Sequence, residues 1–260
     1  YTPMDFFNPF DPAAVDTEYK LGDDMLYGQY LLDSGSDWQF VSVQRRDEDG
    51  DVDSAVSSTA IKFHGFGVNR EFDLLLADHY DQTVLGAGGL VNLGEAVLRG
   101  DVTFTDARDG WETSLVVNWS WSWVAGGLNL SAVAEYFYSG FGLEESDYSP
   151  ENFRENRDLV ERLQRGELFT VGRHSLAGSL LVELTPLLNL TPNVFFNAED
   201  GSALAQLVLQ WDLAQNWQVL GSLGLPLGSS NTEYGGLDTG VDGQTLEVGP
   251  SLFAQLAWYF

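Results

Sequence analysis

The chain has 260 residues, enough for one large domain. Its 39 acidic and 12 basic residues give a formal charge of −27 at pH 7, which argues against nucleic-acid binding. It has no cysteine, so no disulfide framework can form, and no apolar run of about 18 residues that would make a transmembrane helix. Eight Trp, ten Tyr and sixteen Phe are too many aromatic residues for a disordered acidic chain, so we expect a folded domain.

Apolar and polar residues alternate with a period of two along most of the chain, which predicts an all-β fold. In 111–124, Trp119 and Trp121 share one face, whereas Glu112 and Asn118 share the other. Such strands fit a soluble sandwich with the apolar face inward, or a membrane barrel with that face toward lipid. The predicted strands, thirteen in all, are 25–33, 37–46, 57–66, 70–80, 83–91, 95–105, 111–124, 127–141, 168–184, 188–198, 202–213, 216–227 and 246–260.

The last predicted strand, 246–260, is long for a soluble strand and closes on Trp258, Tyr259 and Phe260. A C-terminal strand that ends in Phe resembles the last strand of bacterial outer-membrane β-barrels. The resemblance implies an antiparallel transmembrane β-barrel in a bacterial outer membrane, spanning 1–260 as one domain. In that family the barrel-assembly machinery recognises this strand, so it is an implied partner, together with outer-membrane lipid and lipopolysaccharide.

Connection lengths alternate between short and long, as in barrels with periplasmic turns and extracellular loops. If the last strand runs toward the periplasm, as the resemblance implies, 93–94, 125–126 and 214–215 are periplasmic turns. The acidic segment 47–56, the long segment 142–167 and the segment 228–245 are then extracellular loops.

Counting back from the last strand, the segment 1–24 begins outside the cell as a loop-like segment. Bacterial single-chain barrels have even strand numbers, so we expect either further N-terminal strands beyond this chain or one strand that the pattern does not reveal. Because a barrel of this kind must be secreted, we also expect a removed signal sequence. The opening, Tyr1-Thr-Pro-Met-Asp-Phe-Phe-Asn-Pro-Phe-Asp-Pro12, resembles a stretch of larger porin-like and alginate-export-like barrels. An exporter of a polyanion needs a basic lumen, and this chain departs from that pattern.

Aromatic residues fall near the predicted strand ends, where their amphipathic rings suit membrane–water interfaces. We predict an interface girdle of Trp111, Trp119, Trp121, Trp123, Tyr136, Tyr138, Trp211, Trp217, Trp258 and Phe260.

The opposite parity of the strands carries acidic, basic and amide side chains. They would line a wet permeation path, or form ion pairs that close a narrow barrel. The predicted pore-lining residues are Lys62, His64, Asp73, Glu95, Arg99, Asp101, Glu112, Asn118, Glu135, Arg173, Glu183, Gln206, Gln210 and Asp212.

The loop 142–167 contains a predicted helix. Ser149 is a suitable N-cap, Pro150 fits the first turn, and Gly166 is a suitable stop. The helix would fold inward and narrow the pore, pack across the barrel mouth, or contact a partner.

The loop 47–53 places Asp47, Asp49, Asp51 and Asp53 at alternate positions around a glycine, a spacing of oxygen ligands that suits weak Ca²⁺ binding; exposed loop acids are the simpler interpretation. The histidines, His64, His79 and His174, follow no zinc spacing, and no hydrolase or nucleotide motif is present. We therefore expect no catalytic residues and no resident cofactor; an acid–His site at His79, beside Asp78 and Asp81, is the weaker alternative.

The function we predict is passive passage of small hydrophilic solutes or ions, with a mild preference for cations from the acidic mouth. The alternative is a closed structural or partner-binding barrel that acts through its acidic extracellular loops. An outer-membrane enzyme and a soluble sandwich are the remaining hypotheses. The sequence leaves the solute and the oligomeric state open.

Overall fold

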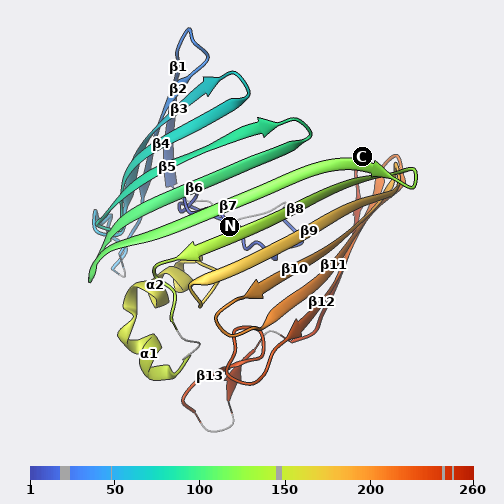
Figure 1. Cartoon of the computed structure of the whole chain (residues 1–260). Helices are drawn as coiled ribbons and strands as arrows, with labels where there is room; N and C mark the ends of the chain where they lie inside the picture. The colour runs from blue at the N-terminus through green and yellow to red at the C-terminus, as the bar shows by residue number, and fades with distance from the viewer. Residues whose placement is uncertain (18–23, 48, 145–147, 242–243, 248) are drawn as a thin grey trace.

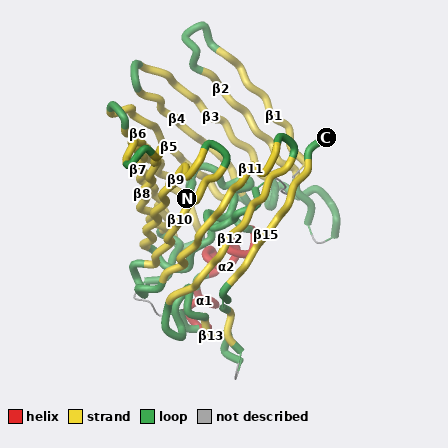
Figure 2. Tube along the Cα trace, turned by 90° about the vertical axis from the view of Figure 1, so that its right-hand side faces the viewer, coloured by secondary structure: helices red, strands yellow, loops and turns green. Residues whose placement is uncertain are grey.

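The computed structural model describes residues 1–17, 24–47, 49–144, 148–241, 244–247 and 249–260. Within them, thirteen antiparallel strands form one sheet whose order follows the chain. The sheet is curled, so that its first and last strands lie on the same side of the molecule (Figures 1 and 2). Its strands are β1 (Asp24–Leu31), β2 (Asp37–Gln44), β3 (Ser58–Gly67), β4 (Arg70–His79), β5 (Gln82–Leu93), β6 (Ala96–Ala107), β7 (Gly110–Ala125), β8 (Leu128–Ser139), β9 (His174–Thr185), β10 (Leu188–Asn197), β11 (Ala203–Ala214), β12 (Trp217–Leu227) and β15 (Ser251–Trp258).

The all-β antiparallel prediction is confirmed, and so is the number of main strands. In the described residues β1 and β15 are the two ends of the sheet, and no ladder joins them, so closure of a barrel stays a prediction. No helix in the described part of the chain has the length and apolar character to cross a bilayer.

Tight turns gather at one edge of the sheet, which we call the short-turn edge. Asn69 (φ 59°) and the Gly126–Gly127 pair (φ 61° and 81°) supply the left-handed backbone that two-residue hairpins need. The opposite edge, the long-loop edge, carries the connections 45–57, 140–173 and 228–250. This edge also carries the two-residue turns 80–81 and 108–109, so the predicted alternation of short and long connections holds for only part of the chain.

Two predicted strands were too long. The strand predicted at 246–260 is wrong in its first part, because the main-sheet strand begins at Ser251. Leu246 instead pairs with Leu237 in a separate two-stranded sheet, β13 (Leu237–Asp238) and β14 (Thr245–Leu246). Pro250 has no N–H to give to a ladder, which explains the break. The strand predicted at 168–184 begins only at His174.

The two faces of the sheet differ in polarity. Along β7, Trp119 is 52% exposed on the convex face, whereas Val116, on the concave face, is 2% exposed. Leucine, valine and aromatic side chains continue the convex face across the whole sheet, for example Leu76, Leu207 and Leu223. A soluble sandwich would bury such a face against a second sheet. Here it is exposed in the described structure.

The first seventeen residues, which we call the N-terminal strap, lie on the concave face. The ring of Tyr1 stacks on Phe137 of β8 at 4.6 Å between centroids. Phe6 packs with Leu75 and Val84 of β4 and β5. The main-chain oxygen of Ala13 accepts a hydrogen bond from the Gln206 amide at 2.8 Å. The described part of the segment 1–24 thus runs along the inside of the curled sheet rather than as an outward loop; 18–23 lie outside the described residues.

Residues 140–144 and 148–173, the helical segment, fold over the long-loop end of the concave face (Figure 1). The predicted caps are confirmed: Ser149 caps α1 (Pro150–Glu155), and Gly166, at φ 67°, ends α2 (Arg157–Arg165). The predicted single helix is two, because Asn156 interrupts it. Its side chain accepts a hydrogen bond from Leu159 N at 3.0 Å and caps α2.

The helical segment is anchored by a hydrophobic cluster rather than by polar contacts alone. Leu159 and Tyr148 are fully buried and pack with Val116, Phe137 and Phe141. Because Val116 and Phe137 lie on the concave faces of β7 and β8, the segment folds inward, which is one of the three positions predicted for it.

Truncating the buried Leu159 tests this anchor. Leu159→Ala removes a fully buried side chain and should lower the free energy of unfolding by about 2–5 kcal/mol, measured by denaturant unfolding in detergent micelles. Val68→Ala, at a turn residue that is 90% exposed, should change it by less than about 0.5 kcal/mol. Equal effects of the two changes would contradict the anchoring role.

Candidate functional site

The concave face carries most of the predicted pore-lining residues. All of them except Glu95 and Arg173 lie at concave positions of β3, β4, β6, β7, β8, β9 and β11. Glu95 lies in the turn between β5 and β6, outside either strand. Arg173 precedes β9 and binds the Gly142 carbonyl at 3.0 Å and the Glu144 carboxylate. Their role as a pore lining stays a prediction.

Neighbouring strands pair many of these polar side chains. Asp73 lies 2.9 Å from His64 Nδ1 and 3.6 Å from Lys62 Nζ. Asn118 donates to Glu135 at 3.1 Å across β7 and β8. Lys62 neutralises Asp73, and the Tyr1 ammonium, 2.7 Å from Glu135, neutralises that carboxylate. Such ion pairs are what the hypothesis of a closed barrel expects.

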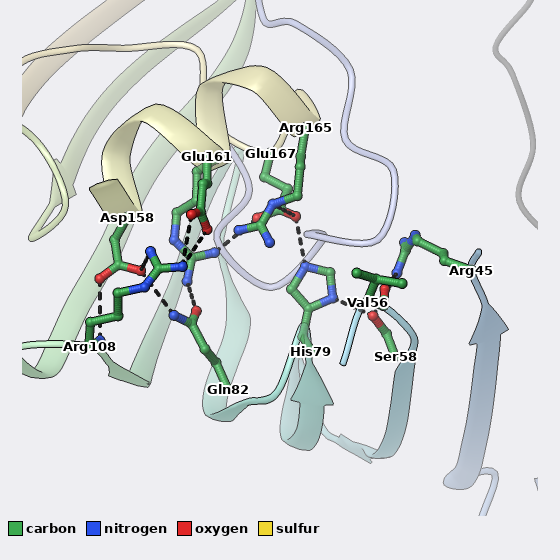
Figure 3. Close-up of polar contacts among 11 residues, drawn as sticks. Arg45, Val56, Ser58, His79, Gln82, Arg108, Asp158, Glu161, Arg165 and Glu167 are labelled. Atoms are coloured by element: carbon green, nitrogen blue, oxygen red, sulfur yellow. Dashed lines mark hydrogen bonds and ion pairs between the residues drawn. The ribbon is translucent and has the colours of Figure 1, made fainter. Parts of the chain in front are cut away.

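The helical segment meets the sheet through a polar cluster centred on Glu167 (Figure 3). One Glu167 oxygen lies 2.9 Å from His79 Nε2 and 3.0 Å from Arg165 Nε, and the other accepts from Arg162 Nη1 at 2.9 Å. The side chains of Glu167 and Arg162 are 6% and 8% exposed. Burial raises the pKa of Glu167, but the hydrogen bond from His79 and the two guanidinium charges outweigh it and hold that pKa below its usual value.

A second set of contacts lies beside the first, as Figure 3 shows. Asp158 of α2 accepts from Gln82 at 3.0 Å and from Arg108 at 3.1 Å, and Arg108 also binds Glu161 at 2.8 Å. These contacts join the helix to the ends of β5 and β6. Arg162 bridges the two sets, because it also donates to the Gln82 side-chain oxygen.

His79 does not form the acid–His pair with Asp78 or Asp81 that the sequence suggested as the weaker alternative. Its Nδ1 lies 2.8 Å from Ser58 Oγ and its Nε2 faces Glu167. This is a hydroxyl–imidazole–carboxylate relay, but Arg45 donates to the same hydroxyl at 2.7 Å, and Phe6 and Phe7 cover the imidazole ring. Ser58 is only 3% exposed, so the arrangement fastens the segment and offers no nucleophile to solvent.

Another buried cluster lies on the β9–β12 side of the concave face. The Asn197 amide donates to Tyr148 at 2.8 Å and to Glu233 at 2.6 Å. Burial, together with the negative charge of Asp200, raises the pKa of Glu233 to about 7. A Cβ at position 172 would lie within 3 Å of both Asn197 and Tyr148, so only glycine fits there. The sequence analysis named neither Glu233 nor Glu167.

The strap lines more than two cavities in the described structure, and two of them reach β10 and β11. One, of about 420 Å³, lies between Pro12–Val15 and the concave residues of β8–β11. The other, of about 480 Å³, lies between Asp11–Ala13 and β10–β12, and reaches Glu233 and Glu247 at the long-loop edge. Both are lined by Tyr1, Pro12, Phe195 and Gln206, so they are neighbours.

The aromatic residues predicted for the girdle lie on the convex face at the two edges, apart from Phe260, which follows β15 and is fully exposed. Trp121 and Trp123 stack at 5.3 Å near the β7–β8 turn, and Trp217 stacks on Trp258 at 5.8 Å near the β11–β12 turn. Trp211 lies near that turn as well, whereas Trp111, Tyr136 and Tyr138 lie toward the long-loop edge. The arrangement is that of two aromatic bands; their contact with lipid stays a prediction.

The acidic loop predicted for Ca²⁺ is described except for residue 48. The Asp47 carboxylate accepts from Asp49 N and Asp51 N at 3.0 Å, and the Asp53 carboxylate accepts from Ala55 N at 2.9 Å. Two of the predicted ligands therefore bind their own loop. Among the described residues, no three acidic or histidine side chains gather closely enough to hold a metal ion.

Comparisons with known proteins give one loose likeness. No family model and no curated protein matches the chain. A solved structure described as the NanC porin, in a rhombohedral crystal form, aligns over 91% of this chain and 99% of that chain, with 9% identity and a TM-score of 0.35. At this TM-score, neither the fold nor the function of that protein can be transferred to this chain.

Replacing Glu167 tests whether the polar cluster holds the helical segment. Glu167→Gln keeps the shape but removes the charge facing the buried Arg162, and should cost about 3–5 kcal/mol at neutral pH. Because the pKa of Glu167 is lowered, its contribution is present above its usual value of 4.5 and is lost as pH falls through the lower folded value. The cost should therefore shrink in acid, as measured by denaturant unfolding at a series of pH values.

Glu151→Gln is the matched control. The Glu151 side chain is 73% exposed and pairs with Arg154, so its loss should cost less than about 1 kcal/mol at every pH. A Glu167→Gln cost as small as this would show that the cluster does not hold the segment.

Proposed function

We propose that the chain forms the wall of a β-barrel in a bacterial outer membrane, and that small hydrophilic solutes or ions pass through it without catalysis. The observation that carries the proposal is the polarity of the sheet. Its convex face exposes large apolar side chains, such as Leu225 at 56%, Leu252 at 79% and Trp258 at 57%. An exposed apolar surface of this extent is rare on a soluble monomer and is the outer surface that a membrane barrel needs.

Charge supports a mild preference for cations. The chain carries 27 more formal negative than positive charges, and Asp11, Glu233 and Glu247 line the cavity that reaches the long-loop edge. Fixed negative charge in a narrow path raises the local concentration of cations, and the width of the path sets the size limit. No group needs to react, so we propose that the chain is not an enzyme. Its partners would be outer-membrane lipid, lipopolysaccharide and, during insertion, the barrel-assembly machinery.

The second candidate function is a closed barrel that binds a partner or has a structural role. It is favoured by the strap and the helical segment, which cover much of the concave face and bury Phe6, Leu159 and Tyr148 against it. In this case the acidic loops at the long-loop edge would be the surface that binds the partner. The two functions differ in one property, which is whether current flows.

A conductance measurement distinguishes the open channel from the closed barrel. The purified full-length protein, inserted into a planar bilayer under a salt gradient, should give steady single-channel currents with a reversal potential shifted toward that of the cation. Protein unfolded by heat before insertion is the control and should give none. Silence from correctly folded protein would contradict the passage and favour the closed barrel.

A further inference from the structure

The larger of the two cavities, between the strap and β10–β12, is lined by aromatic and acidic side chains. Tyr1, Phe169, Phe195 and Tyr234 present aromatic side chains to it, and Asp11, Glu233 and Glu247 present carboxylates. The neighbouring cavity adds Glu135. The Tyr1 ammonium lies 2.7 Å from Glu135 and neutralises that carboxylate. Among the described residues that line the two cavities there is no lysine, arginine or histidine, so the carboxylates of Asp11, Glu233 and Glu247 have no cationic side chain beside them in the lining.

The size of the space fits a small molecule. Each cavity, at about 420 and 480 Å³, falls in the range of about 300–1,000 Å³ that small-molecule sites occupy. The remaining walls are mainly apolar, with Val171, Leu204, Leu237 and Leu246 beside the aromatic rings. Mostly apolar walls with a few acidic groups suit a ligand that has an apolar body and a positive end.

We propose that the cavity between the strap and β10–β12 binds a small organic cation, a substituted ammonium with an apolar body. Aromatic faces attract such a cation through the ring quadrupole. The buried Glu233 carboxylate adds charge attraction that water screens only weakly, and the exposed Asp11 and Glu247 add a weaker attraction. The inference deepens the proposed passage by naming a class of solute, and the binding can be measured whether or not current flows.

A bare metal ion fits the same carboxylates less well. The Glu233 carboxylate accepts the Asn197 amide at 2.6 Å, and the Asp11 carboxylate accepts Ala13 N at 2.8 Å. These carboxylate oxygens already accept hydrogen bonds from the protein. They also do not point toward one common position, since no group of three acidic side chains in the described residues is placed to hold a metal. An organic cation needs no shell of oxygen ligands, and aromatic and aliphatic walls accommodate its body.

Glu233 gives the site a distinctive pH dependence. Because burial raises the pKa of Glu233 to about 7, about half of this carboxylate is protonated near neutral pH. A bound cation favours the ionised form, so binding should strengthen as pH rises through 7 and should release a proton. The other titratable groups around Glu233 and this cavity are Asp200, Glu199, Tyr148, Tyr234, Asp11, Glu247, the Tyr1 phenol, and the Tyr1 ammonium with its partner Glu135. The tyrosines whose pKa burial raises, Tyr1, Tyr148 and Tyr234, stay neutral in this range.

Isothermal titration of the full chain in detergent micelles tests the site with benzyltrimethylammonium as the cation and benzyl alcohol as its uncharged counterpart. Micelles without protein correct for partitioning. The cation should bind about tenfold more tightly at about pH 8 than at about pH 6, and benzyl alcohol should show no pH dependence and much weaker binding. No binding of the cation, or equal binding of the two probes, would overturn the proposal.

Variants locate the binding. Glu233→Gln should weaken cation binding at about pH 8 by about tenfold and abolish its pH dependence. If that variant does not fold, Glu247→Gln, at an exposed residue of the same cavity, should weaken binding severalfold. Glu183→Gln is the control, because Glu183 lies near the short-turn edge, away from both cavities, and should leave binding unchanged. Equal losses in Glu233→Gln and Glu183→Gln would place the cation elsewhere and reject the site.

The two proposals can fail separately. Cation binding by protein that is silent in a bilayer would reject the passage and keep the site. Steady currents from protein that binds neither probe would reject the site and keep the passage.

Discussion

The opposite polarity of the two faces of one sheet is the constraint on which the rest of the structure depends. Successive side chains of a strand point to opposite faces, so each strand places its apolar set on one side. In this chain that set lies on the convex face, where Trp119 and Leu252 are exposed, and the polar set lies on the concave face. In water this large apolar surface would stay exposed at a hydrophobic cost, so an apolar medium against the convex face would stabilise such a sheet.

The concave face then sets how the other segments fold. Its polar groups are bonded to neighbours across the strands, as Asn118 is to Glu135, and its few apolar side chains receive the strap and the helical segment. Two sets of contacts hold the helical segment on the sheet, which are the packing of Leu159 and the ion pairs of Glu167. Cavities remain beside β8–β12, where aromatic and acidic residues line them.

Local signals made the strands, the turns and the helix caps predictable. Alternation identified all the main strands, and Ser149 and Gly166 marked the two ends of the helical region. Where prediction failed, the cause was also physical: Pro250 interrupts the last predicted strand, and the Asn156 side chain splits the helix by capping α2. All the predicted pore-lining residues except Glu95 and Arg173 share the concave face, because parity follows from the pleat alone; that this face lines a lumen stays a prediction.

The rest of the candidate site could not be read from the sequence, since it depends on contacts between distant residues. His79 and Glu167 are 88 positions apart, and Tyr1, at the start of the chain, stacks on Phe137 of β8. Glu233 lies in an acidic loop that looks solvated, and only the fold shows that Asn197 and the helical segment bury it. Closure of the sheet between β1 and β15 is likewise a property that alternation cannot indicate.

The most direct test of the account is which face of the sheet meets lipid. The chain has no cysteine, so single cysteines at Val117 and Asn118, adjacent on β7, can each carry a spin label in protein reconstituted into lipid vesicles. The account predicts that the label at 117 collides mainly with oxygen, which concentrates in the bilayer, and that the label at 118 collides mainly with a water-soluble nickel chelate. Equal accessibility of the two labels to the nickel chelate would contradict it.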